Sequence, residues 1–148
     1  MFIRIYLDNW CLQHPLDDQT HPRIRVETEA VFIILAAVQS GDQQLISSEA
    51  LEHEIARIPD ADRRAEVLSV LTLASERFEI TDSIEVTAQG FEQSGIGAMD
   101  AIHLALASHA NADYFCTCDD ALFRKAQTLA GLNCKVITLL GLVPEVTK

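Results

Sequence analysis

The stretch Gly95-Ile96-Gly97-Ala98-Met99-Asp100-Ala101-Ile102-His103-Leu104-Ala105-Leu106-Ala107 has the composition of a buried helix that carries one acidic side chain in its first turn. Small and apolar residues cover nearly every face of this helix, which favours packing against neighbours on all sides. An unpaired carboxylate in such a setting is strongly destabilising, so Asp100 must be solvated, paired or bound to a cation. The helix dipole stabilises such a charge by under ~1 kcal/mol in most settings, which is too little to offset the cost of burying the Asp100 carboxylate.

The chain of 148 residues is long enough for one domain with a proper core, over residues 1–148. No apolar run approaches the ~20 residues of a membrane span, and residues 1–7 are too short for a secretory signal. We therefore expect a cytoplasmic protein without membrane attachment. The net charge of −11 disfavours binding of nucleic acid through a broad basic surface. It is compatible with an enzyme that contacts a phosphodiester through a bound metal, and with a basic partner.

Strand and helix patterns alternate along the chain. Apolar and β-branched runs predict strands, and apolar residues at helical spacing predict helices between them. Such an alternation favours an α/β fold with three layers, in which helices cover both faces of a mainly parallel sheet of four to five strands. The predicted strands are 2–7, 44–47, 114–117 and 135–139, with a brief extended segment at 78–81.

The predicted helices are 26–39, 49–58, 61–76, 82–93, 95–107 and 119–131. Residues 9–25 contain two prolines and several polar residues, which predicts a loop, and a short tail follows Gly141. Side chains with capping geometry precede three helices. We expect Ser48 to cap one helix, and Asp82 with Glu85 and Thr117 with Asp120 to form capping boxes.

The helix over residues 26–39 has two apolar faces. Val31 and Ile34 belong to one stripe, whereas Phe32 and Ile33 lie off it. This pattern predicts burial on the sheet together with a second contact, which another subunit would provide.

The four cysteines show no C-x-x-C spacing. Cys116 and Cys118 lie on one face of a predicted strand, which favours structural thiols over a zinc site or a disulfide.

Acidic residues follow the predicted strands where ligands gather in an open parallel sheet, at the carboxyl ends of the strands. Asp8 and Asp119 come just after strands, Asp100 begins a helix, and Glu54 lies early in the helix after a strand. We expect these carboxylates to converge on one cavity. Crowded carboxylates raise one another's pKa unless a cation neutralises them, and hard oxygen ligands suit Mg²⁺ or Mn²⁺.

Four motifs with these acids resemble, in order, the acidic motifs of the PIN domain family, over residues 3–139. The resemblance implies a PIN-like fold and a metal-dependent ribonuclease, commonly a VapC-type toxin that a small antitoxin holds inactive. The Asp-Ala-Ile-His-Leu-Ala run with Thr-x-Asp at the next strand end is the most specific part. The motifs are Tyr6-Leu7-Asp8-Asn9, Ser48…Glu54-Ile55, Ala98-Met99-Asp100-Ala101-Ile102-His103-Leu104-Ala105 and Thr117-Cys118-Asp119-Asp120.

By this resemblance the ribonuclease cleaves RNA with Mg²⁺ or Mn²⁺ as cofactor. Its metal ligands would be Asp8, Asp100 and Asp119, of which Asp119 would complete the site or bind a second ion. Glu54 would hold a metal-bound water or help to position it. We expect Thr117 to hydrogen-bond a ligand carboxylate. Asn9 is a candidate for support of the site from beside Asp8, although a turn role explains it equally well. The implied catalytic quartet is Asp8, Glu54, Asp100 and Asp119.

Several residues compete for these roles. Glu49 and Glu52 are alternatives to Glu54, and Asp120 is an alternative to Asp119. His103, one turn after Asp100, is explained better as a structural histidine than as a general acid or base. Trp10 is expected to pack on a helix, with stacking on a base as the alternative.

Other functions fit the sequence less well. A phosphoryl-accepting receiver domain needs an acidic pair after the first strand and a lysine after a late strand. A haloacid dehalogenase needs Asp-x-Asp after the first strand. The chain has Asp8-Asn9-Trp10 at that position, which fits neither class. The stronger alternative is a catalytically inactive PIN-fold binding module that acts through protein or RNA contacts. The two-faced helix and the acidic charge further predict a homodimer and a small antitoxin whose basic segment reaches the acidic cavity.

Overall fold

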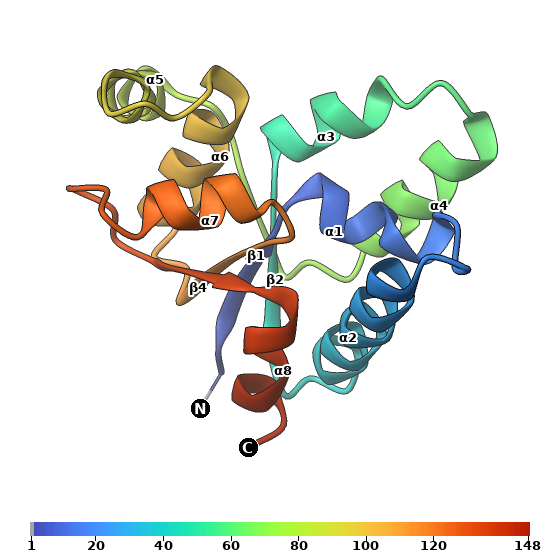
Figure 1. The fold of residues 1–148 in the computed structure, drawn as a ribbon. Coiled ribbons are helices and arrows are strands. Elements are labelled where there is room, and N and C mark those ends of the chain that lie inside the picture. The colour runs from blue at the N-terminus through green and yellow to red at the C-terminus, as the bar shows by residue number, and fades with distance from the viewer. Residues whose placement is uncertain (1) are drawn as a thin grey trace.

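The computed structural model describes residues 2–148, so Met1 lies outside the described range. Within it, five strands form one parallel sheet in the order β3-β2-β1-β4-β5 (Figure 1). The prediction of a mainly parallel sheet of four to five strands is therefore confirmed. The strands are β1 (Arg4–Leu7), β2 (Gln44–Ser48), β3 (Glu76–Phe78), β4 (Tyr114–Thr117) and β5 (Lys135–Thr138).

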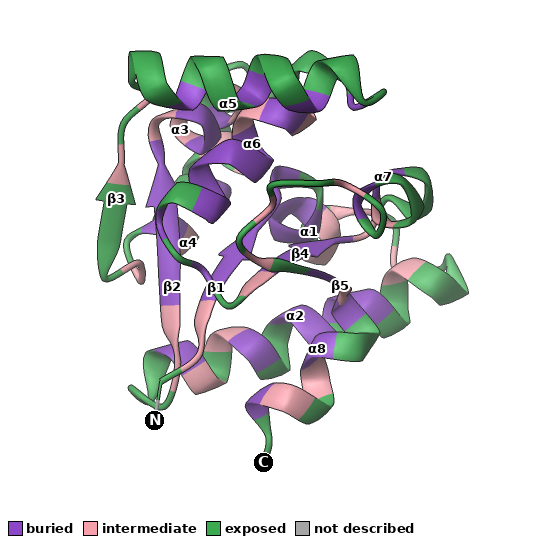
Figure 2. Ribbon diagram, turned by 90° about the vertical axis from the view of Figure 1, so that its left-hand side faces the viewer, coloured by how far each residue is buried: buried purple, intermediate pink, exposed green. Residues whose placement is uncertain are grey.

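Helices cover both faces of this sheet (Figure 1). Helix α6, with α5 outside it, lies on one side, and α2 with α8 lies on the other. Figure 2 shows the middle of α6 buried beneath α5, whose outer surface is exposed. The helices are α1 (Asn9–Gln13), the short 3-10 helix η1 (His14–Leu16), α2 (Pro22–Gln39), α3 (Glu49–Ala56), α4 (Ala61–Leu71), α5 (Asp82–Gln93), α6 (Ala98–His109), α7 (Asp120–Ala126) and α8 (Leu139–Val146).

The central strand β1 determines where a ligand site forms. It pairs with β2 on one side, where Ile5 lies opposite Leu45, and with β4 on the other, where Ile5 lies opposite Tyr114. Because the chain proceeds from β1 to β2 and β3 and only later adds β4 on the opposite side, the strand order reverses between β1 and β4. In open α/β sheets, ligands bind beyond the carboxyl ends of the strands at such a point.

The prediction of a loop over residues 9–25 was wrong. This segment contains α1, η1 and the first turn of α2. The Asp8 carboxylate caps α1 by accepting the Cys11 backbone N–H at 3.0 Å. Pro22 occupies the start of α2, where its fixed φ suits the helix and its missing N–H is not needed. Pro22 therefore begins a helix, although the prolines of this segment had predicted a loop.

Two helix ends also differ from the prediction. Helix α4 ends at Leu71 and not at residue 76, because residues 76–78 pair with β2 as strand β3. Helix α7 ends at Ala126, five residues before the predicted end. The predicted tail after Gly141 is instead part of α8, whose Thr138 hydroxyl accepts the Gly141 N–H at 3.0 Å.

The predictions of helix-capping residues were partly correct. The Ser48 hydroxyl accepts a backbone N–H of α3 at 3.1 Å, as predicted. Helix α5 is capped by Thr81 and not by Asp82, and α7 by Asp119 and not by Thr117. In both cases a neighbouring residue with capping chemistry has the extended backbone that the N-cap position needs.

Helix α2 has the predicted second apolar face. Val31 and Ile34 are fully buried in the core, whereas the side chains of Phe32 and Ile33 are 57% and 41% exposed. Among the described residues, no helix combines the length and the apolar character needed to cross a membrane.

Two adjacent isoleucines of α2 give a test of this core. Ile34→Ala should lower the free energy of unfolding by about 2–5 kcal/mol, because it leaves a cavity beneath the helix. Ile33→Ala removes the same atoms from a partly exposed position and should cost less than ~1 kcal/mol. Urea denaturation measures both, and equal losses would contradict the orientation of α2.

Candidate functional site

The Asp8 carboxylate lies at the carboxyl end of β1 and is 7% exposed. One of its oxygens accepts the Thr117 hydroxyl at 2.6 Å, and the other accepts the Cys11 N–H at 3.0 Å. The backbone N–H of Asp8 donates to the Cys116 carbonyl at 3.1 Å. Burial raises the pKa of Asp8, whereas these hydrogen bonds oppose the shift by favouring the charged form. The carboxylate is thus fixed from both β4 and α1.

Thr117, fully buried at the end of β4, joins two acidic segments. Its hydroxyl donates to Asp8 and accepts the Asp119 backbone N–H at 3.1 Å. Asp119 in turn uses Oδ1 to accept the N–H groups of Ala121 and Leu122 at 2.9 and 3.1 Å. Thr117 makes the contact to a carboxylate that the sequence predicted. The capping role of Asp119 engages Oδ1, and among the described residues its Oδ2 accepts no hydrogen bond.

Asp100 lies in the first turn of α6, as predicted, and is partly buried. Its pKa is raised chiefly by burial and then by the negative charges of Asp119, Asp8 and Glu54, while His103 lowers it. The three other predicted acids therefore lie near enough to Asp100 to affect its ionisation. The four carboxylates that the sequence singled out thus lie in one region of the structure.

Glu54, on α3, is held by a buried chain of polar groups that sequence reasoning missed. Its Oε1 contacts Nε2 of His103, which is 3% exposed. The His103 Nδ1 lies 2.6 Å from the Tyr6 hydroxyl, which lies 2.6 Å from the Ser48 hydroxyl. One arrangement satisfies every donor in turn: Ser48 donates to Tyr6, Tyr6 to Nδ1, and Nε2–H to Glu54. This supports the structural interpretation of His103.

The competing carboxylates are engaged elsewhere. Both carboxylate oxygens of Glu52 accept the Arg77 guanidinium at 2.8 Å. Glu49 accepts the backbone N–H of Ile80 at 2.8 Å. Asp120 forms an ion pair with Arg23 at 2.9 Å. These contacts favour Glu54 and Asp119 for the candidate site.

Asn9, the candidate beside Asp8, begins helix α1. Its side chain is buried, and its Oδ1 has no hydrogen-bond partner among the described residues. An unpaired buried carbonyl oxygen is uncommon and is a group that a bound ligand or water would satisfy.

The donor set fits a hard divalent cation. Asp8, Asp100, Asp119 and Glu54 offer only carboxylate oxygens. Burial raises the pKa values of Asp8 and Asp100, and the negative charges of the neighbouring acids raise that of Asp100 further. A cation would offset this repulsion, and Mg²⁺ and Mn²⁺ prefer such ligands.

Comparison with known proteins bears on this site. A model of the PIN domain family matches residues 21–128, more than half of the chain. No curated protein matches the sequence. The fold is similar to that of a chain in the crystal structure of VapBC2 from Rickettsia felis bound to a DNA fragment from their promoter, with a TM-score of 0.58 and 13% sequence identity. The match covers 92% of this chain and 98% of that one, and at this identity it shows the fold alone.

The crowding of the carboxylates predicts that Asp100→Asn stabilises the metal-free protein at neutral pH. The pKa of Asp100 in the folded state lies above its ordinary value of 3.8, so stability falls as the pH rises from that value through the folded-state pKa. In a chelator the variant should melt a few degrees above the wild type at neutral pH, and the difference should shrink near pH 3.8. Thermal melts followed by circular dichroism measure it.

Asp120→Asn is the matched control. Arg23 lowers the pKa of Asp120, so its charge favours the folded state and its loss should not raise the melting temperature. If Asp100→Asn melts no higher than the wild type, the neighbouring carboxylates do not destabilise the charged form of Asp100 as predicted.

Proposed function

Because this chain belongs to the PIN domain family, we propose that it is a metal-dependent endoribonuclease that hydrolyses RNA phosphodiesters. The observation that supports this best is the convergence of four carboxylates beyond the carboxyl ends of β1 and β4. PIN domains are generally nucleases, and this acidic site fits the divalent cation that such hydrolysis uses.

In this proposal Asp8, Asp100 and Asp119 hold Mg²⁺ or Mn²⁺. The ion, when bound, would lower the pKa of water and offset the charge that develops on the phosphodiester. Thr117 fixes Asp8 relative to Asp119, so the ligands need little rearrangement. Glu54, held by His103, positions the water for in-line attack, and no side chain needs to act as a covalent nucleophile.

Trp10 is a candidate for contact with the RNA in this proposal. Its side chain is 62% exposed in the first turn of α1, two residues after Asp8, so the prediction that it packs on a helix was wrong. An exposed indole beside the site offers a face on which a base can stack.

Cleavage of pooled RNA in Mn²⁺ tests the activity. Asp100→Asn should reduce the rate by about 100-fold or more, above the 10- to 100-fold that loss of a supporting group costs. Glu54→Gln should also reduce the rate, because it removes the group that positions water. Gel analysis of the products over time measures both.

Glu52→Gln is the control, because it removes a carboxylate of the same helix that pairs with Arg77 outside the site. It should cut as fast as the wild type. Equal cutting by wild type and Asp100→Asn would show that the assigned site is wrong. If the wild type neither cuts RNA nor melts higher in millimolar Mn²⁺, the protein is the inactive binding module.

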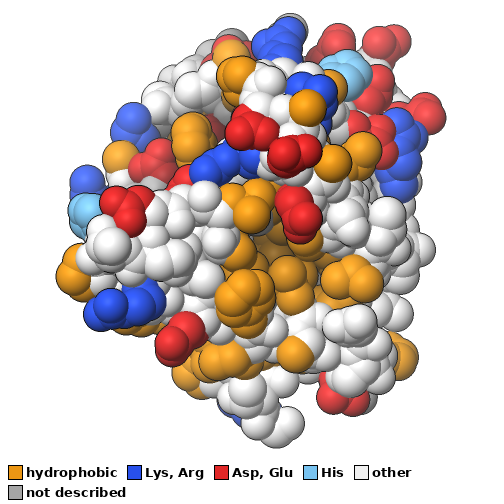
Figure 3. All heavy atoms as spheres, turned by 90° about the vertical axis from the view of Figure 1, so that its right-hand side faces the viewer, with side chains coloured by type: hydrophobic (Ala, Val, Ile, Leu, Met, Phe, Trp, Pro, Cys, Tyr) orange, Lys and Arg blue, Asp and Glu red, His pale blue; other side chains and the backbone are white. Residues whose placement is uncertain are grey.

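We further propose that the protein is the toxin of a type II toxin–antitoxin pair, as in the VapC-type members of the family, and that it forms a homodimer. An apolar groove lies between α2, η1 and α4 and includes Leu16, Phe32, Leu35 and Val67. Figure 3 shows hydrophobic side chains gathered around a hollow on this face. An antitoxin helix would cover the groove, and a basic segment of it would be attracted to the acidic site by the net charge of −11.

Co-expression with the small protein of the neighbouring gene tests the partner. Phe32→Asp should abolish co-purification, because it places a charge in the groove. Val86→Asp, at a 68% exposed position of α5, should leave it intact. Light scattering of the isolated chain measures the homodimer. A monomer with no affinity for the neighbouring product would contradict this proposal.

A further inference from the structure

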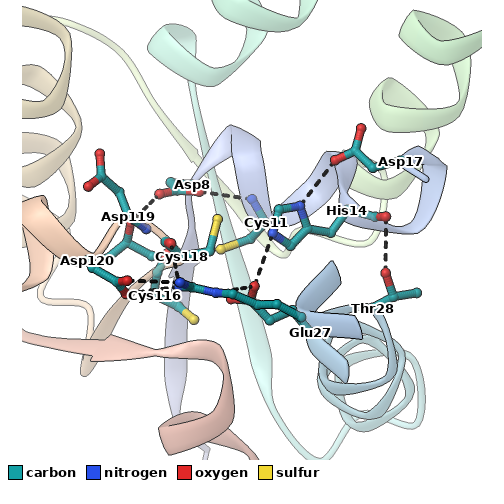
Figure 4. A network of polar contacts seen from close by, with 12 residues as sticks. Asp8, Cys11, His14, Asp17, Glu27, Thr28, Cys116, Cys118, Asp119 and Asp120 are labelled. Carbon is teal, nitrogen blue, oxygen red and sulfur yellow. Dashed lines mark hydrogen bonds and ion pairs between the residues drawn. The ribbon is translucent and has the colours of Figure 1, made fainter. Parts of the chain in front are cut away.

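A second cluster of ionisable side chains lies beside the acidic site and takes no part in the proposed cleavage. Figure 4 shows His14 between Asp17 and Glu27, with Cys118 nearby. A ring nitrogen of His14, a carboxylate oxygen of Glu27 and Sγ of Cys118 all lie within 4.8 Å of one another. Glu27 is 6% exposed, and the His14 side chain is 12% exposed. The cluster joins η1, α2 and the segment after β4.

The separation of His14 and Glu27 suits two ligands of one ion. His14 Nε2 lies 3.6 Å from Glu27 Oε1, beyond the usual range of an N–H···O hydrogen bond. Two ligands at zinc–nitrogen and zinc–oxygen distances of about 2.1 Å, with a tetrahedral angle between them, are themselves about 3.4 Å apart. The observed separation is therefore close to the one that a shared ion requires.

We propose that His14, Glu27 and Cys118 form a second cation site, which binds a transition ion of the Zn²⁺ class in preference to Mg²⁺. The donor set of imidazole, thiolate and carboxylate is one that Zn²⁺ accepts, whereas Mg²⁺ prefers oxygen alone. Three protein ligands leave a fourth position for water.

The groups around these ligands have the arrangement expected at a metal site. His14 Nδ1, the nitrogen that faces away from Glu27, lies 3.2 Å from Asp17 Oδ2. Asp17 in turn accepts the Arg63 guanidinium at 2.7 Å. Histidines that bind metals commonly donate their other N–H to a carboxylate, which orients the ring and increases its basicity. The chain from Arg63 through Asp17 would hold Nε2 toward the ion.

Without a metal ion, polar contacts hold the cluster together, and Glu27 Oε1 accepts the Arg23 Nε–H at 3.0 Å. The neighbouring Cys118, Asp17 and Glu27 raise the pKa of His14, which favours a proton on its ring. Zn²⁺ would displace this proton and that of the Cys118 thiol, which makes binding weaker as the pH falls.

The site would connect to the acidic site through the chain itself. Cys118 lies between Thr117, which bonds Asp8, and Asp119. An ion on Cys118 would tie this segment to η1 and α2, and so restrain the position of Asp119.

Cobalt binding tests the proposal without any measurement of RNA cleavage. Reduced, chelator-treated protein should develop the near-ultraviolet thiolate-to-metal band when one equivalent of Co²⁺ is added, and Zn²⁺ should remove the band by competition. Cys118→Ser should abolish the band. His14→Asn, which keeps the thiol, should weaken Co²⁺ binding by about 100-fold, and Asp17→Asn by about 10- to 100-fold.

Cys134→Ser and Asp100→Asn are the controls. Cys134 is a partly buried thiol outside the cluster, and Asp100 belongs to the acidic site. Both variants should keep the band and the affinity for Co²⁺. Absence of the band in the wild type, its persistence in Cys118→Ser, or unchanged affinity in His14→Asn would overturn the proposal. Asp100→Asn changes the acidic site and leaves His14, Glu27 and Cys118 intact. The outcome of the Co²⁺ experiment is therefore independent of whether the protein cleaves RNA.

Discussion

The candidate site depends on one hydroxyl group. Thr117 donates to the buried Asp8 carboxylate and accepts the backbone N–H of Asp119, so it couples the ends of β1 and β4. Without this contact and that of Cys11, the carboxylate would lose the hydrogen bonds that offset its burial. The strand order places these two ends side by side at the point where the sheet reverses direction, and a few short hydrogen bonds then determine how the acids face one another.

The helices supply the remaining carboxylates by two different means. Asp100 is carried by α6, whose Leu104 and Ala105 are fully buried, so the apolar body of the helix holds the charge at the edge of the site. Glu54 is held by a side chain instead, because His103 contacts it and is itself fixed by Tyr6. Both devices limit motion of the carboxylates, which is the condition for binding an ion with little loss of conformational entropy.

Two kinds of donor set lie within one small region. The acidic site offers carboxylate oxygens, whereas the neighbouring cluster offers imidazole, thiolate and a carboxylate. This difference in chemistry allows each set to prefer a different class of ion. Cys118 and Asp119 are adjacent in the chain, so the loop after β4 would contribute to both sites. Its conformation is the feature through which one site would affect the other.

The sequence by itself determined the alternation of strands and helices and the parallel sheet, and it indicated four candidate acids, because apolar periodicity and the positions after strands are local signals. Tertiary structure alone decided how the largely helical residues 9–25 are held, since Arg63 of α4 donates to Asp17 and to the Leu16 carbonyl across the fold. It also decided which acids are available, because Arg77 binds Glu52 and Arg23 binds Asp120 across the fold. The contacts of Tyr6 with His103, and of His14 with Glu27, join residues distant in sequence. No local pattern encodes such contacts, because they form only when separate elements pack together.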